Sequence, residues 1–286
     1  MPRSRGAPGR RTLADKVDWF GAPATEEEAA RVAALYDLDY AARDLAADVD
    51  WFRGLARLTG GPILELGCGT GRVAVPLAVD GHAVVGLDRS SAMLARAERR
   101  ARAVGADVRW VEGDMRNFSF DATFALITVP ANTFLMLAPD ERWQCLARSR
   151  EHLAPDGRLA IDVFQPDPAR IAGLDGGVVR DWTREDPESG REVAKFSSVQ
   201  ANVDGTTFRW WYEEVDPGGA VRRWEREATL HYLYRREAEL LFPEAGFEIE
   251  SMHGDYDGSS TGPRSPKLLI VAKRRERGAG RERRRE

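Results

Sequence analysis

The sequence predicts an α/β protein with a Rossmann-like, mostly parallel seven-stranded sheet and a small antiparallel β insertion. Three observations carry this prediction. Short apolar segments alternate with amphipathic helical segments from residue 62 to residue 164, a pattern typical of parallel strands joined by right-handed crossovers. A glycine-rich loop, Glu65 to Gly71, directly follows the first apolar segment. After Pro166 the pattern changes to strand-like segments separated by hairpin turns.

The first predicted element is a helical cap at residues 25–58. Thr25 and Glu28 have the spacing of a capping box, and apolar residues recur after them at helical intervals. Gly60 and Gly61, followed by Pro62, end this helix and lead into the first strand. The next predicted elements are a helix at 71–79, a strand at 83–88, a helix at 90–104, strands at 108–112 and 123–129, a helix at 140–152 and a strand at 158–164.

An antiparallel unit is predicted between the fifth strand and the last helix. Its strand-like segments are 191–203, 206–215 and 221–234, joined by hairpin turns at 204–205 and 216–219. A helix at 235–246 and strands at 247–253 and 267–272 complete the sheet. The predicted main domain comprises residues 19–166 and 235–273, and its first part, 19–60, is the helical cap. The insertion, 167–234, is predicted to form a substrate lid. Disordered basic tails are predicted at 1–18 and 274–286.

Composition excludes several classes of protein. No apolar run approaches the roughly 18 residues of a membrane-spanning helix, and the N-terminal segment lacks the apolar centre of a secretory signal. The two cysteines, Cys68 and Cys145, provide no disulfide framework, and the four histidines show no metal-binding spacing. We therefore expect no metal, no membrane partner and a cytoplasmic location.

Charge is unevenly distributed along the chain. The net charge is −4, but residues 1–11 carry +4 and residues 273–286 carry +5, which leaves about −13 on the body between them. Basic ends can bind nucleic acid or an anionic surface. These ends are rich in Gly and Arg and contain no aromatic residue for base stacking, which favours solubilising tails. Because the acidic body repels phosphate, we do not expect nucleic acid as a partner.

The spacing of the glycine loop indicates which cofactor it binds. A dinucleotide site requires G-x-G-x-x-G, but the residue at the position of the third glycine is Arg72. The spacing E-x-G-x-G-x-G, running from Glu65 to Gly71, instead resembles motif I of the class I S-adenosylmethionine-dependent methyltransferases. Glycines in that motif let the backbone approach the cofactor closely. The alternative is a tight strand-to-helix turn that binds nothing.

Two acidic residues at later strand ends add to the resemblance. Asp88 ends the second strand, where a carboxylate accepts hydrogen bonds from ribose hydroxyls. Asp114 follows the third strand, where the resemblance implies a contact with the adenine amino group and Met115 beside the ring. A single aspartate at such a place is more often a helix cap or a surface charge. The resemblance implies the class I methyltransferase fold, whose seven-stranded sheet contains one antiparallel strand. It also implies S-adenosylmethionine as cofactor, S-adenosylhomocysteine as product, and as cofactor-binding residues Tyr36, Glu65, Gly67, Cys68, Gly69, Gly71, Asp88, Arg89, Met93, Asp114, Met115 and Val129.

Over residues 30–273 the chain resembles actinobacterial small-molecule methyltransferases, in particular the N,N-dimethyltransferases of nucleotide-linked amino sugars. The segments that carry this resemblance, besides the glycine loop and the insertion, are Leu35–Leu38, Gly86–Leu94, Gly113–Phe118 and His152–Gly157. One departure matters: many relatives carry Asn-x-Phe-Leu-His-Leu after the fourth strand, and here Met136 replaces that histidine. Methyl transfer to an amine tolerates the loss, because its barrier falls mainly through positioning and desolvation.

Residues on the acceptor side are predicted from their positions. The catalytic candidates are Tyr36 in the helical cap, Asn132 after the fourth strand and His231 in the insertion. The candidates for substrate contacts are Tyr40, Phe134, Trp210, Tyr212 and Tyr256. The alternative is that the aromatic residues only pack the insertion onto the body and that a lone strand histidine is structural.

The sequence therefore predicts an enzyme, a methyltransferase that transfers a methyl group to a nitrogen or oxygen of a small-molecule metabolite, mainly by proximity and orientation. One alternative is methylation of RNA or protein. Against it, the Asn/Asp-Pro-Pro-Tyr/Phe tetrad of amino-methylating nucleic-acid enzymes is absent from the segment Val129 to Asn132. A second alternative is a catalytically silent cofactor-binding protein. The sequence names neither the acceptor nor the oligomeric state, and it leaves a homodimer open.

Overall fold

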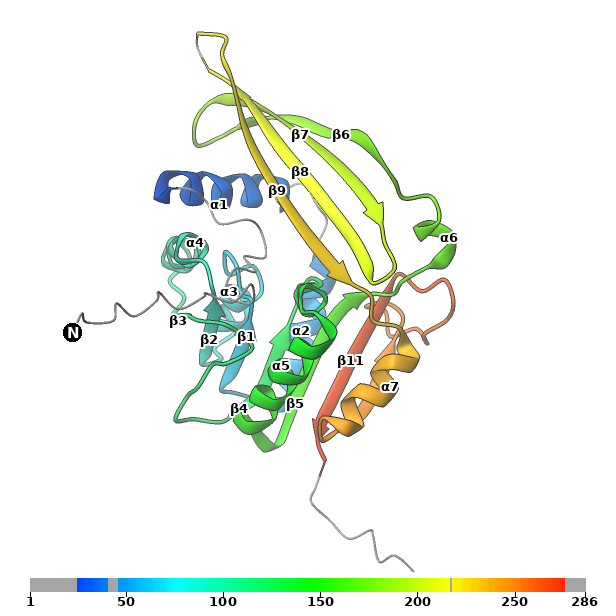
Figure 1. Ribbon diagram of the computed structural model, residues 1–286. Helices are drawn as coiled ribbons and strands as arrows, with labels where there is room; N and C mark the ends of the chain where they lie inside the picture. Colours follow the sequence, from blue (N-terminus) through cyan, green and yellow to red (C-terminus); the bar gives the residue numbers. More distant parts are fainter. Residues whose placement is uncertain (1–24, 41–45, 217, 276–286) are drawn as a thin grey trace, which may run out of the picture.

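A computed structural model describes residues 25–40, 46–216 and 218–275 (Figure 1). The predicted tail at 1–18 and nearly all of the predicted tail at 274–286 lie outside these residues. In the described ranges, no helix is both long enough and apolar enough to cross a membrane.

A seven-stranded sheet forms the centre of the main domain. Its strands lie in the order β10-β11-β5-β4-β1-β2-β3. Strands β1 to β5 pair in parallel, whereas β11 runs antiparallel to both β5 and β10. The predicted fold class is confirmed, including its single antiparallel strand. The strands are β1 Ile63–Leu66, β2 Val84–Asp88, β3 Val108–Glu112, β4 Phe124–Val129, β5 Leu153–Phe164, β10 Phe247–His253 and β11 Lys267–Arg274.

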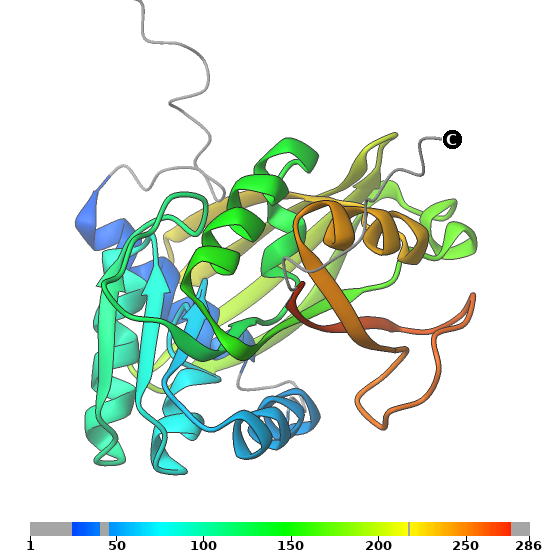
Figure 2. The same cartoon turned by 90° about the horizontal axis from the view of Figure 1, so that it is seen from below.

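Helices cover both faces of this sheet (Figure 2). Successive strand residues point to opposite faces, so Leu64 and Leu66 belong to the apolar cluster that includes α5 and α7 side chains, while Ile63 belongs to the cluster of α2 and α3. Helix α4 packs beside α3 on the second of these faces. The helices are α2 Ala46–Thr59, α3 Ala74–Val79, α4 Ser91–Ala103, α5 Pro139–His152 and α7 Arg235–Glu244.

The insertion forms a separate four-stranded antiparallel sheet, called here the second sheet, in the order β6-β7-β8-β9. Three strand-like segments were predicted, and β6 is the strand that the prediction lacks. It lies at an edge, and most of its residues are exposed and polar, so it shows no apolar alternation. The elements are α6 Pro168–Ile171, β6 Asp175–Asp186, β7 Arg191–Ala201, β8 Gly205–Val215 and β9 Val221–His231.

Helix α1, Glu26–Tyr40, lies between the second sheet and the first (Figure 1). Its predicted cap is present, since the Thr25 hydroxyl accepts the Glu28 amide at 3.1 Å. The prediction of one helix over 25–58 is wrong, because α1 and α2 cover different surfaces. Leu35 of α1 packs on Tyr212 of the second sheet, whereas Phe52 of α2 packs on the first sheet. An amphipathic pattern shows that a helix buries one face but not which surface covers it.

Arg142 of α5 joins the second sheet to the main domain. Its side chain is fully buried, and it donates to the carbonyl of His231 at 2.7 Å and to the carbonyl of Tyr232 at 3.0 Å. It also donates to the Glu237 carboxylate at 3.2 Å. The end of β9 and the start of α7 are therefore held by one guanidinium.

Replacing Arg142 by Met is expected to lower the free energy of unfolding by about 2 to 4 kcal/mol, because buried acceptors left without a donor cost about 1 to 3 kcal/mol each. Urea denaturation followed by circular dichroism measures this loss. Arg148→Met is the matched control, since the Arg148 side chain on the same helix is 41% exposed and pairs with Glu151 at 2.6 Å. Equal denaturation midpoints for the two variants would contradict the role given to Arg142.

Candidate active site

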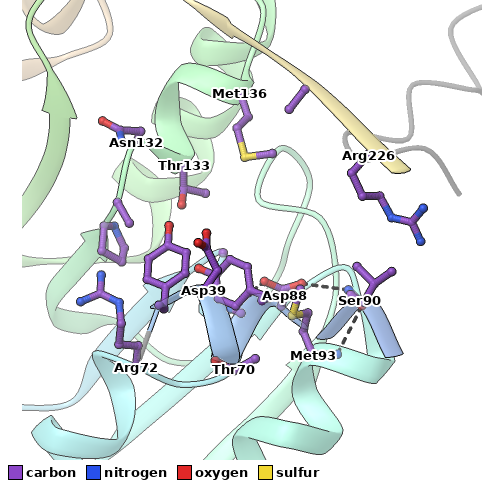
Figure 3. A pocket seen from close by; sticks show the side chains of 18 of the residues that line it. Asp39, Thr70, Arg72, Asp88, Ser90, Met93, Asn132, Thr133, Met136 and Arg226 are labelled. Atoms are coloured by element: carbon purple, nitrogen blue, oxygen red, sulfur yellow. Dashed lines mark hydrogen bonds between the residues drawn. The ribbon is translucent and has the colours of Figure 1, made fainter. Parts of the chain in front are cut away.

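A cavity of about 850 Å³ lies where the carboxyl ends of β1 to β4 face α1 and the inner side of the second sheet (Figure 3). Open parallel sheets bind ligands at this edge, and the volume suits a small-molecule site, roughly 300 to 1,000 Å³. The predicted site residues that line the cavity are Tyr36, Tyr40, Glu65, Gly67, Cys68, Gly69, Asp88, Arg89, Met93, Asp114, Met115, Asn132, Trp210 and Tyr212.

The glycine loop forms the floor of the cavity. Gly67 and Gly69 have φ angles of 68° and 53°, in the left-handed region that glycine adopts without strain. A Cβ on Gly67 would collide with the Thr133 side chain, while a Cβ on Gly69 would be in ordinary van der Waals contact with the Tyr36 hydroxyl, 4.0 Å away. Gly71 does not line the cavity; a Cβ there would meet the Trp110 ring at 2.8 Å. Packing against the Trp110 ring therefore explains why residue 71 is a glycine.

Asp88 connects the end of β2 to the glycine loop. One carboxylate oxygen accepts the Gly69 amide at 2.8 Å. The other accepts the Ser90 amide at 2.9 Å (Figure 3). Burial raises the pKa of Asp88, and these two amides oppose the rise. A carboxylate oxygen has further acceptor capacity, so Asp88 can still accept hydrogen bonds from hydroxyl groups in the cavity.

Glu65 is a buried acid on the cavity wall. It is 1% exposed, and burial raises the pKa of its carboxyl to about 8, although Arg72 opposes the rise. Arg72 is itself paired with Asp48 at 2.6 Å. The Oε2 atom of Glu65 has no hydrogen-bond partner among the described residues. A buried carboxyl oxygen without a hydrogen-bond partner is suited to binding a cationic group of a ligand, such as the ammonium of a methionine moiety.

Asp114 has a different environment. Burial opposes its ionisation, but hydrogen bonds from Arg116 lower the pKa of Asp114 below its usual range. Arg116 donates to it at 2.6 Å, and the Arg89 guanidinium lies 3.7 Å away. Asp114 therefore stays ionised and can accept a hydrogen bond from a neutral donor such as an amino group on a purine ring. Met115 beside it supplies apolar surface.

Two tyrosines of α1 form one side of the cavity. The rings of Tyr36 and Tyr40 are stacked with centroids 4.3 Å apart, and Arg72 lies 5.6 Å from the Tyr40 centroid. Burial raises the pKa of Tyr36 well above its usual value, so its hydroxyl stays protonated. Burial also raises the pKa of the Cys68 thiol, which makes it an inert wall residue.

The inner face of the second sheet supplies the opposite wall, and most of this wall was missed from the sequence. Lys195 of β7 is buried and donates to Asp39 of α1 at 2.8 Å. Arg226 of β9 donates to Glu28 at 3.1 Å. The other residues of this wall and its surroundings that the prediction lacked include Asp181, Trp182, Arg184, Ser197, Val199, Phe208, Ala228 and Leu230. They share one face only through the register of β6 to β9, which no motif encodes.

Four further predicted residues do not line the cavity. Val129 and Phe134 are fully buried in the core. His231 lies at the end of β9, where its carbonyl accepts from Arg142; burial and Arg142 lower the pKa of its ring. Tyr256 donates its hydroxyl to Asp162 at 2.8 Å. The geometry thus gives these four side chains structural surroundings instead of contact with the cavity.

Known proteins resemble this chain in both sequence and structure. The methyltransferase domain family matches residues 63–157. The cypemycin N-terminal methyltransferase of a Streptomyces species is 31% identical over 236 residues, which cover 79% of this chain and 88% of that protein. The dTDP-3-amino-3,4,6-trideoxy-alpha-D-glucopyranose N,N-dimethyltransferase of Streptomyces venezuelae is 28% identical, covering 78% of this chain and 93% of that protein.

A solved structure agrees with these sequence matches. The amino pentose methyltransferase CalS10 of Micromonospora echinaspora, whose structure contains S-adenosylmethionine, superposes with a TM-score of 0.65 at 27% identity. The match covers 84% of this chain and 96% of that one.

Binding of S-adenosylhomocysteine is expected to release a proton from Glu65 near neutral pH. The ligand ammonium favours the carboxylate, so a carboxyl group whose pKa is about 8 in the free protein loses its proton on binding. Affinity should therefore rise with pH up to about 8, by at most about tenfold per pH unit. Calorimetric titration in two buffers of different ionisation enthalpy measures the proton release.

Glu65→Gln is the control for this linkage, because its side chain cannot titrate. It should bind more weakly and without proton release. Wild-type binding with equal heat in both buffers would contradict the assignment of a neutral Glu65 in the free protein.

Proposed function

This chain belongs to the S-adenosylmethionine-dependent methyltransferase family, and from that premise we propose that it methylates an amine of a small molecule held beneath the second sheet. It is an enzyme, and its cofactor is S-adenosylmethionine. One observation carries the proposal for the acceptor: the same cavity continues from the glycine loop to the inner face of β7, β8 and β9. One enclosure can therefore hold donor and acceptor together.

The strand order supports an assignment for each part of the cofactor. Along the sheet, the residues that follow β3, β2, β1 and β4 come in that spatial order. Asp114 would receive the adenine end, Asp88 the ribose, and Glu65 with the glycine loop the methionine end. The acceptor then lies beyond the methionine end, next to Asn132 after β4.

The chain's own contribution to the reaction is positioning and exclusion of water. S-adenosylmethionine supplies an activated methyl group on a sulfonium. Tyr36 and the second sheet cover the cavity, and Asn132 and Thr133 lie at its acceptor end. Holding two reactants in line lowers a barrier by about 7 to 11 kcal/mol in well-oriented systems, which is sufficient without a general base.

The wall composition favours nitrogen over oxygen as the methyl acceptor. None of the described residues that line the cavity is a histidine, and Met136 lies on the wall where many relatives carry one. Tyr36 remains protonated because burial raises its pKa, and Asp39 is paired with Lys195. A neutral amine is already nucleophilic, whereas an alcohol needs a base.

The charges on the wall support an acceptor without phosphate groups. Every Lys or Arg on the described part of the wall already has a carboxylate or carbonyl partner; Lys195 pairs with Asp39, Arg226 with Glu28, and Arg184 with the Leu38 carbonyl. The surfaces between these cations are apolar or aromatic: Met136, Val199, Phe208, Trp210, Ala228 and Leu230. Bringing a diphosphate there would require breaking existing ion pairs.

Replacing Asp88 by Ala is expected to weaken binding of S-adenosylhomocysteine by about 1 to 3 kcal/mol, the loss when buried hydroxyl groups go unpaired. Isothermal titration calorimetry measures the change. Asp107→Ala is the matched control, because Asp107 is exposed just before β3. Unchanged affinity in the Asp88 variant would refute the ribose assignment.

A panel of acceptors tests the proposed reaction. The enzyme is incubated with S-adenosylmethionine and plain aliphatic or aromatic amines, peptides with a free N-terminus, dTDP-linked amino sugars, and alcohols that match the plain amines. Mass spectrometry is expected to find added methyl groups on amines that carry no phosphate, and none on the matching alcohols. Methylation confined to the dTDP-linked sugars would refute the phosphate-free acceptor, and methylated alcohols would refute the preference for nitrogen.

A further inference from the structure

The chain enters the acceptor end of the cavity in a strained conformation. Ala131 and Asn132, called here the left-handed pair, follow β4 with φ angles of 55° and 65°. Among the described residues they are the only non-glycine residues with positive φ. This conformation costs roughly 1 to 2 kcal/mol for an ordinary L-residue, less for Asn. Such strain persists only where surrounding contacts enforce it.

Asp162 of the neighbouring strand β5 supplies those contacts. Its side chain is fully buried, and its Oδ2 atom accepts the Ala131 amide at 3.2 Å. Its main-chain carbonyl accepts the Asn132 amide at 2.9 Å. The Asn132 side-chain oxygen then accepts the Phe164 amide at 2.7 Å. Both residues of the pair are thus fixed to β5.

Two side chains from the far end of the sequence hold Asp162 in place. Tyr256, in the loop after β10, donates its hydroxyl to Oδ2 at 2.8 Å, and Lys267 of β11 donates to Oδ1 at 2.8 Å. Hydrogen bonds to a charged acceptor are the stronger kind. The carboxylate therefore has one orientation, in which Oδ2 also faces the Ala131 amide.

The left-handed pair fixes the residues that follow it. Asn132 and Thr133 both line the cavity, and the Thr133 side chain lies so close to Gly67 that no Cβ would fit there. A change in the backbone at Ala131 would move the residues at the acceptor end of the cavity. Asp162 itself does not line the cavity.

We propose that Asp162 is a positioning residue for methyl transfer: by holding Ala131 and Asn132 in the left-handed conformation, it sets the acceptor end of the cavity, and Tyr256 and Lys267 orient its carboxylate. The proposal rests on the proposed function for the identity of the reaction. Its structural part, the support of a strained backbone by Asp162, stands on the contacts alone. Tyr256, which the sequence suggested as a substrate contact, does not line the cavity and acts by orienting the Asp162 carboxylate.

A rescue experiment tests the proposal. Asp162→Ala removes the acceptor of the Ala131 amide, and kcat for the best amine of the acceptor panel is expected to fall by about 100-fold, the effect of a small misplacement of reacting groups. Affinity for S-adenosylhomocysteine should stay unchanged. Adding Ala131→Gly to this variant should restore at least about tenfold in kcat, because glycine adopts positive φ without steric strain.

Variants that perturb the network less keep the test decisive if Asp162→Ala fails to fold. Asp162→Asn keeps an oxygen for the Ala131 amide and should retain more kcat than Asp162→Ala. Tyr256→Phe removes one hydrogen bond from the carboxylate and should lower kcat without changing the affinity for S-adenosylhomocysteine, again with rescue by Ala131→Gly. Glu250→Ala is the matched control; it breaks the ion pair with Arg158 at 2.8 Å on the same sheet, away from the cavity, and should leave kcat unchanged.

A stability cycle separates failure of this proposal from failure of the proposed function. Ala131→Gly should raise the urea denaturation midpoint more in the wild type than in the Asp162→Ala or Tyr256→Phe protein, whichever acceptor the enzyme uses, because only the wild type fully enforces the strained conformation that glycine relieves. Equal shifts in all backgrounds, or no rescue of kcat by Ala131→Gly, would overturn the role of Asp162. If the shifts differ as expected but the panel shows no methylated amine, the support of the strained backbone by Asp162 stands. The link between Asp162 and methyl transfer is then rejected together with the proposed function.

Discussion

The carboxylate of Asp37 is the contact on which the closed form of the cavity depends. It accepts hydrogen bonds from the Thr70 hydroxyl at 2.6 Å, from Arg96 at 2.6 Å and from Arg100 at 3.0 Å, and so ties α1 to the glycine loop and to α4. Arg96 also donates to Glu188 at the tip of the β6–β7 hairpin, at 2.6 Å. This half-buried carboxylate and its cations therefore hold α1, the loop and the second sheet around a common space.

Three acids of the cavity share a chemical type but differ in environment. Burial raises the pKa of Glu65 to about 8 and also raises that of Asp88, whereas hydrogen bonds from Arg116 outweigh burial and lower the pKa of Asp114. Asp114, at one end of the cavity, is thus charged at neutral pH, whereas Glu65, at the other end, ionises readily only beside a cation. This difference in pKa between the two ends of the cavity matches a ligand with a neutral ring at one end and an ammonium at the other.

The two halves of the cavity have different origins. The cofactor half comes from short segments at the ends of β1, β2 and β3, where neighbouring residues in sequence are neighbours in space. The acceptor half combines residues such as Asn132, Lys195 and Leu230 from three distant segments. Two relatives, one named as an N-terminal methyltransferase and one as an N,N-dimethyltransferase of a dTDP-linked amino sugar, align over most of the chain length. We therefore expect side chains of the acceptor half to determine which acceptor is used.

The sequence by itself determined the alternation of strands and helices, the glycine loop, and the presence of Glu65, Asp88 and Asp114 at the site, because strand periodicity and turn geometry are local. Only the tertiary structure decided which surface α1 covers, that His231 lies outside the cavity, and that Asp162 supports the acceptor end. The contacts of Asp162 with Tyr256 and Lys267 join residues about a hundred positions apart. Such contacts depend on strand order and register, which arise only when the whole sheet has formed.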